Sequence, residues 1–283
     1  MGFVDNKEAC VHHTDQTPVG RVPVFFIAFG TLALLITSGC GSPNFSGSNP
    51  AAPVPLKNNL TSTAVPVLLY NGTGTSATDV TAVESVLSTL NLKYSTANTT
   101  QVEAMSESKL ASYKLFIVPG GNSITIGNNL SHTATAMIHN AVVKDGLHYL
   151  GICAGAFFGG YSIYNGLNLT NGVWFNFYAD EFKGIHKETV TVSFPNRPKM
   201  DMYWQDGPQL SHWGAMISKY PDGTPVMVEG VSGKGWVMLS GVHPEAPASW
   251  RTGMAFSTTL AADLGYAGTL VTAALNGTAL PHY

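Results

Sequence analysis

Residues 147–155 read LHYLGICAG, an apolar run of strand length that ends in a cysteine between small residues. The run at 147–152 predicts a buried strand, and GICAG at 151–155 lies where such a strand turns into a helix. The pattern G-x-C-x-G has the form of a nucleophile elbow, in which small residues flank the nucleophile because the turn is tight and its backbone crowded. The stretch therefore predicts a strand–turn–helix unit with Cys153 at the turn.

Similar apolar runs occur on both sides of this unit and alternate with helical patterns. Buried strands are predicted at 65–70 (VPVLLY), 114–118 (KLFIV) and 235–239 (GWVML). Residues 79–92 carry valines and leucines at helical spacing, and residues 134–143 are predicted to form a second helix. Strands that alternate with helices favour a parallel sheet covered on both faces, so we expect one α/β domain over residues 65–283.

Residues 173–237 differ in texture, with shorter β-rich pieces and many aromatic side chains. This insert either extends the sheet or forms a β layer beside it. Its rings either belong to the core or line a surface for a sugar or a peptide, because aromatic faces stack well on such ligands. The rings concerned are those of Trp174, Phe175, Phe177, Tyr178, Tyr203, Trp204 and Trp213.

Cys153 has two possible roles. A helix that starts directly after the cysteine favours the thiolate over the thiol, and the thiolate is the nucleophilic form. The alternative is a buried structural cysteine that packs as a small apolar residue. The elbow pattern favours the nucleophile.

A thiolate nucleophile needs a base, and the base needs an orienting partner. The predicted strand at 235–239 leads into His243-Pro244-Glu245. Residues two apart in an extended chain point the same way, so His243 and Glu245 can reach one site. Alone, His243 would more often be structural, but its pairing with Glu245 and an elbow cysteine favours the base.

Two consecutive glycines, Gly120 and Gly121, follow the predicted strand at 114–118. Glycines at this position let backbone N–H groups approach a developing oxyanion closely, although a simple turn would have the same pattern.

The sequence has a strand ending in PGG at 119–121, then GICAG, then a strand ending in HPE at 243–245, and this order resembles the class I glutamine amidotransferase-like superfamily. Within it, the sequence is similar to the domain at the N-terminus of some biotin-protein ligases. The similar segments are ICAGAFF (152–158), YWQDGP (203–208) and GKGWVMLSGVHPE (233–245). The resemblance covers roughly residues 65–275 and implies a flavodoxin-like parallel sheet with helices on both faces and a β-rich insert before the last sheet strands.

The resemblance implies a triad with Cys153 as nucleophile, His243 as base and Glu245 as orienting carboxylate. It also implies that Gly120, Gly121 and the N–H of Ala154 form the oxyanion site.

The sequence departs from the family at two positions. Phe157 replaces the glutamine that follows the nucleophile by four residues in glutamine-hydrolysing members, and Ala154 replaces the histidine of a related branch. Glutamine is therefore not the expected substrate, and without a ligase domain in the sequence we do not expect a biotin ligase. We expect a thiol hydrolase acting on an amide or peptide-like bond. The alternative is an inactive binding or scaffolding protein with a small-molecule or peptide-like ligand.

The N-terminal region predicts export. Residues 22–39 carry no charge and end in small residues before Cys40, which resembles the lipobox of bacterial lipoproteins. We expect a lipoprotein signal over 1–39, lipidation of Cys40, a flexible Pro- and Ser-rich linker over 40–64, and a lipid-anchored protein of the bacterial cell envelope facing the periplasm or exterior. An uncleaved signal anchor or ordinary cleavage are the alternatives.

Composition excludes several other functions. With 14 Lys+Arg, 17 Asp+Glu and a net charge of −3, the chain lacks the basic patch that nucleic-acid binding requires. Cys10 lies in the N-terminal leader, Cys40 follows the apolar run, and Cys153 is alone in the rest of the chain, so no paired disulfide framework is predicted. His186, His212 and Asp206 are scattered and lack metal-ligand spacing, so we expect no metal and no cofactor.

Overall fold

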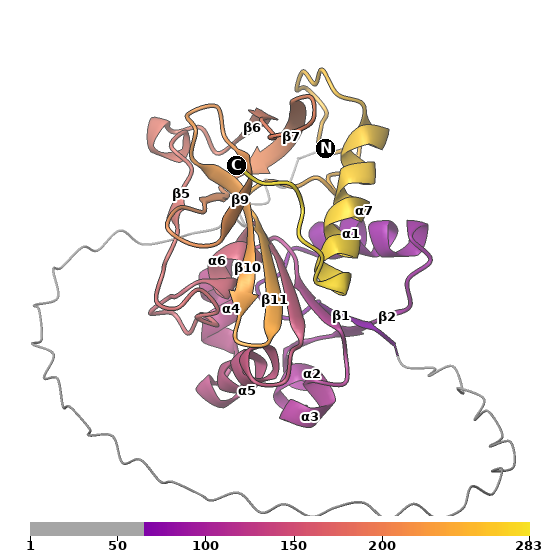
Figure 1. The fold of residues 1–283 in the computed structure, drawn as a ribbon, viewed down its shortest axis with the longest axis vertical. Helices are drawn as coiled ribbons and strands as arrows, with labels where there is room; N and C mark the ends of the chain where they lie inside the picture. The colour runs from indigo at the N-terminus through magenta and orange to yellow at the C-terminus, as the bar shows by residue number, and fades with distance from the viewer. Residues whose placement is uncertain (1–64) are drawn as a thin grey trace, which may run out of the picture. The chain divides into compact units, whose positions relative to one another are not determined.

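The structure is a computed structural model that describes residues 65–283 (Figure 1). The predicted signal over 1–39, the linker over 40–64 and the lipidation site Cys40 lie outside the described residues. Within 65–283, no helix is both long and apolar enough to cross a bilayer.

A seven-stranded sheet runs through the middle of the molecule (Figure 1). Its parallel part has the order β2-β1-β3-β4-β11: Tyr94–Ala97, Val67–Tyr70, Leu115–Val118, His148–Ile152 and Gly235–Ser240. β10 (Pro225–Ser232) and β9 (Ala215–Lys219) continue the sheet as antiparallel strands. The parallel order is that of flavodoxin-like folds, which confirms the predicted fold class.

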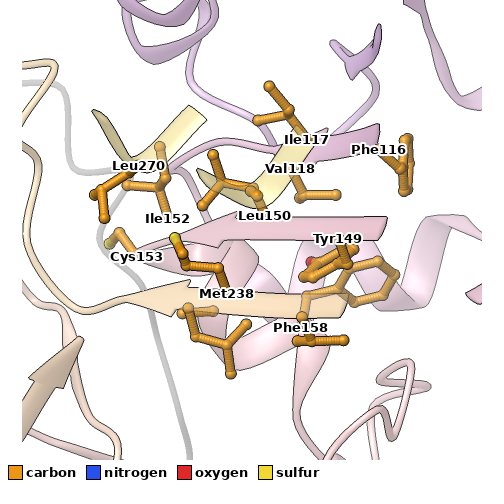
Figure 2. Packing of buried hydrophobic residues seen from close by; sticks show 14 of the residues in the cluster. Phe116, Ile117, Val118, Tyr149, Leu150, Ile152, Cys153, Phe158, Met238 and Leu270 are labelled. Carbon is orange, nitrogen blue, oxygen red and sulfur yellow. The ribbon is translucent and has the colours of Figure 1, made fainter. Parts of the chain in front are cut away.

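Helices cover both faces of this sheet because alternate residues of a strand point to opposite sides. On β4, Leu150 and Ile152 face α1 (Ala77–Thr89) and α7 (Leu260–Asn276), whereas Tyr149 packs against α6 (Ala154–Gly159) (Figure 2). The other helices are α2 (Thr99–Glu103), α3 (Glu107–Leu110), α4 (Ser123–Asn129), α5 (His132–Val143) and the short 3₁₀ helix η1 (Glu181–Lys183).

The aromatic insert both extends the main sheet and forms β structure beside it, the two alternatives that its sequence pattern left open. β9 and β10 extend the main sheet, while two antiparallel ribbons form beside it. One ribbon pairs β5 (Asn176–Phe177) with β8 (Pro208–Gln209), and the other pairs β6 (Lys187–Val192) with β7 (Met200–Gln205). β7 matters for the site because its end reaches the loop that follows β11, through a bridge between Tyr203 and His243.

Candidate active site

Cys153 lies at the sharp turn between β4 and α6. Its backbone has φ 50° and ψ −106°, a conformation rare for residues with a side chain. The adjacent glycines make this turn possible: a Cβ on Gly151 or Gly155 would come closer than 3.0 Å to the carbonyl oxygen of Gly155 or Val118, respectively. The strand–turn–helix unit predicted at 147–155 is confirmed, and the spacing of its glycines has a steric cause.

The surrounding structure holds Cys153 firmly in this strained conformation. A non-glycine residue in such a region costs about 1–3 kcal/mol and persists only where its neighbours fix it. The N–H of Cys153 donates to the carbonyl of Ser240 at 2.8 Å, and its thiol donates to the carbonyl of Gln205 at 3.4 Å. With an exposed fraction of 2%, the side chain is buried at the carboxyl edge of the parallel sheet.

His243 and Glu245 form a buried pair in the loop after β11. The Nδ1 atom of His243 lies 2.9 Å from Oε1 of Glu245, and both side chains are almost fully buried. The sequence-based expectation that the two side chains reach one point is therefore met in the structure. Because Nδ1 faces the carboxylate, the other ring nitrogen, Nε2, is the atom left to exchange protons with a reacting group.

The sheet brings the cysteine and this pair to the same edge. Ile152 and Ser240 are partners in the parallel pairing of β4 with β11, so Cys153 and the loop carrying His243 leave the sheet together. Both then meet the end of β7: the N–H of His243 donates to the carbonyl of Tyr203 at 2.8 Å, and the Cys153 thiol contacts the carbonyl of Gln205.

Two aromatic rings pack against His243. Those of Tyr203 and Trp250 have their centroids 5.8 Å and 5.6 Å from the centroid of its imidazole, both edge to face. These ring contacts hold the imidazole in one orientation.

A second carboxylate, Asp79, was not anticipated from the sequence. Its Oδ1 atom lies 3.2 Å from Nδ1 of His243, the same nitrogen that faces Glu245, so two carboxylates share one side of the imidazole. Asp79 is in the first turn of α1, which Ser76 caps by accepting from the N–H of Asp79. A signal was present in the sequence: Asp79 shares the apolar face of this helix with Val83 and Val86, where a buried acid needs a partner.

The two carboxylates control the protonation of the histidine. Burial alone would lower the pKa of His243, but the carboxylates of Glu245 and Asp79 outweigh it and raise that pKa to about 10. Burial raises the pKa of the Glu245 carboxyl above its ordinary value, partly offset by the charge on His243. At neutral pH the imidazole is therefore held as the cation, which is a proton donor and an electrostatic partner for a thiolate.

Gly120 and Gly121 lie next to these groups. A Cβ on Gly120 would come closer than 3.0 Å both to Asp79 Oδ1 and to His243 Cε1, and one on Gly121, whose φ is 144°, would overlap the backbone around Gly74. Glycine is thus required at both positions for close packing. Ala154, the third predicted oxyanion residue, is the first residue of α6, so its N–H has no acceptor within the helix.

Most aromatic side chains of the insert belong to the core. Phe175, Phe177, Tyr178, Tyr203 and Trp204 are buried, which decides against a broad aromatic binding surface. Trp174 differs, with 46% of its surface exposed. Phe157 is buried edge to face on Phe177 at 5.1 Å, so the position of the family's substrate-holding glutamine is filled by core packing here.

The expectation that His186 and Asp206 are scattered is wrong. The Nδ1 atom of His186 lies 3.0 Å from Oε1 of Glu181 and 3.1 Å from Oδ1 of Asp206. The register of the β6–β7 ribbon places these positions opposite each other, whereas His212 is not in this group. Within residues 65–283, this group and Asp79–His243–Glu245 each present three ligand atoms within 4.8 Å of one another, a spacing suited to a metal ion.

A family model and a solved structure match this chain, the first over part of its length and the second over most of it. The biotin-protein ligase N-terminal family model matches residues 65–171, which include the elbow but end before His243. The solved structure of a glutamine amidotransferase from Methylobacillus flagellatus superposes with a TM-score of 0.50 at 10% identity, covering 78% of this chain and 98% of that one. The chain therefore has a flavodoxin-like fold similar to that of this glutamine amidotransferase.

Another solved structure matches with a lower score. The exo-β-1,4-mannosidase Op5Man5 from an Opitutaceae bacterium matches with a TM-score of 0.49 at 13% identity, over 73% of this chain. This chain spans only 36% of the mannosidase. No curated protein is detectably similar to the chain in sequence.

Proposed function

We propose that this chain is a thiol-dependent hydrolase of an amide or peptide-like bond, with Cys153 as nucleophile and His243 as acid and base. The observation that carries the proposal is the strained elbow of Cys153 at the sheet edge that also holds the His243–Glu245 pair, 2.9 Å apart. Backbone strain at a residue with a nucleophilic side chain is typical of an active site. Glu245 and Asp79 act as positioning residues that hold the imidazole and its charge.

The reaction would proceed in two steps. In the first, the Cys153 thiolate attacks the carbonyl carbon, a C–S bond forms, and the oxyanion is stabilised by N–H groups at the elbow and at Gly120 and Gly121. The His243 cation then donates its Nε2 proton to the departing nitrogen as the C–N bond breaks. In the second step, neutral His243 takes a proton from a water molecule as its oxygen attacks the thioester carbon. A C–O bond forms, the C–S bond breaks, and the carboxylic acid leaves, which restores the Cys153 thiolate and the His243 cation.

We further propose that the protein is exported and anchored through lipidated Cys40, and that it works in the bacterial cell envelope. Its substrate is then an amide or peptide-like compound of that compartment. Glutamine is a poor candidate because Phe157, which stands at the position of the substrate-holding glutamine, is buried.

A binding or scaffolding role is the second candidate, and one observation favours it. Exposed Trp174 lines a cavity of about 420 Å³ together with polar side chains: Asn176, Gln209, Ser211 and His212. An aromatic face beside hydrogen-bonding groups suits a sugar or peptide ligand.

An activated ester tests the chemistry without knowledge of the substrate. The full-length chain is expected to release one equivalent of nitrophenolate from p-nitrophenyl acetate in a fast burst, because Cys153 becomes acylated. The Cys153→Ala variant should lose the burst, while the Cys40→Ala control should keep it. A burst that persists in Cys153→Ala, or one absent from the wild type, would favour the binding role.

A further inference from the structure

A second polar cluster lies at the end of the β6–β7 ribbon, and the proposed hydrolase does not use it. Lys187 pairs with Gln205 in this antiparallel ribbon, so the next residues outward, His186 and Asp206, stand opposite each other. The N–H of Asp206 donates to the carbonyl of His186 at 2.9 Å, and Glu181 approaches from η1. Three elements thus bring one histidine and two carboxylates together.

The buried carboxylate in this cluster lacks a partner for one of its oxygens. Asp206 is only 1% exposed, and while its Oδ1 atom pairs with His186, its Oδ2 atom is buried without a hydrogen bond. The Oε2 atom of Glu181 is also buried without one. Buried carboxylate oxygens without donors are costly, and a cation removes that cost.

The cluster is maintained against further unfavourable features. Asp206 has φ 46°, in the left-handed region that few residues with a side chain adopt. One ligand atom from each of Glu181, His186 and Asp206 lies within 4.8 Å of the other two. Two carboxylates, of which that of Asp206 stands on a strained backbone, therefore lie close together, and a cation between them would stabilise this arrangement.

We propose that Glu181, His186 and Asp206 bind a divalent zinc-class cation. One imidazole nitrogen and two carboxylates form a ligand set that suits zinc better than magnesium or calcium, which prefer oxygen alone. The side chain of His186 is 64% exposed, so water can complete the coordination from the solvent side. The proposal is independent of the hydrolase activity, because none of the three residues belongs to the proposed triad.

Zinc titration of the full-length chain, by competition with a chromogenic chelator, tests this proposal. We expect Asp206→Asn and His186→Gln each to weaken binding at one site by at least about tenfold, since the first removes a ligand's negative charge and the second replaces the imidazole nitrogen by a neutral amide. Asparagine tolerates the left-handed backbone at 206, and His186 is exposed, so both variants should fold, as thermal unfolding can verify. His282→Gln, which removes an exposed histidine elsewhere, is the matched control.

Two outcomes would overturn the site. Histidine and cysteine side chains are general zinc ligands and also occur outside the described residues, so the comparison between variants decides rather than the total zinc bound. If Asp206→Asn and His186→Gln both bind zinc as the wild type does, the cluster holds no metal. If only His243→Gln loses a zinc ion, the ion belongs to the Asp79–His243–Glu245 group instead. A cobalt(II) spectrum that changes in His186→Gln would independently support ligation by that imidazole.

Discussion

Replacing Gly155 with alanine is expected to lower the free energy of unfolding by about 3 kcal/mol or more, or to prevent folding. The added Cβ would come closer than 3.0 Å to the backbone carbonyl of Val118, in the neighbouring strand β3. Neither partner can move easily, because β3 is fully buried and α6 follows the fixed turn at Cys153. Urea unfolding followed by circular dichroism measures this effect.

The matched control is Gly265→Ala in α7. A Cβ there meets nothing within 4 Å, so the alanine gains helix propensity without a clash and should stabilise the protein by up to about 1 kcal/mol. If Gly155→Ala proves as harmless as Gly265→Ala, the elbow is not as tightly packed as the structure indicates.

The free energy of unfolding is expected to fall as the pH rises from about 8.5 to about 10, above the range in which a thiol with a lowered pKa contributes in the opposite direction. His243→Gln should remove most of this fall. The folded pKa of His243 is about 10, against 6.5 for the ordinary side chain. A raised folded pKa means that the stabilisation is complete below pH 6.5 and is lost as the pH rises through 10. One such proton gives a slope of at most about 1.4 kcal/mol per pH unit.

The variants separate this contribution from others. Glu181 and Glu188 have pKa values raised to about 7, so their contributions change mainly below the chosen range. Glu245→Gln should narrow the pH range over which the stability falls, because the carboxylate of Glu245 is the largest of the influences that raise the pKa of His243. His282→Gln should leave the slope intact. An unchanged slope in His243→Gln would show that this histidine is not held as a cation.

The fold was largely predictable because its central strands are continuous apolar runs. In a parallel sheet covered on both faces, β1, β3 and β4 are buried along nearly their whole length, so their positions are visible without knowledge of any contact. The turn at Cys153 was equally visible, since close backbone packing restricts its neighbours to glycine. β2 and α7 were not predicted. In the case of β2 (YSTA), the reason is that only one of its residues is fully buried, so it has no apolar run.

The rest of the site depends on contacts that a single sequence does not specify. Asp79 contacts His243 only because α1 starts at the same sheet edge. Helical periodicity identifies the buried valines of α1, but it does not identify the partner of Asp79. His186 and Asp206 meet because of the register of the β6–β7 ribbon. A shift of one residue in that register would have separated them, and nothing in the local pattern fixes it.

The most direct test of the proposed thiol chemistry is the alkylation rate of Cys153 by iodoacetamide from about pH 5 to about pH 10, in the full-length chain, resolved by peptide mass spectrometry. We expect the rate to reach its plateau with a midpoint well below the ordinary thiol pKa of about 8.5, because the His243 cation stabilises the thiolate. In His243→Gln the midpoint should return to about 8.5 or higher, with a rate at pH 6 about tenfold lower. A wild-type midpoint at or above about 8.5, unchanged in His243→Gln, would identify Cys153 as a buried structural cysteine and contradict the hydrolase.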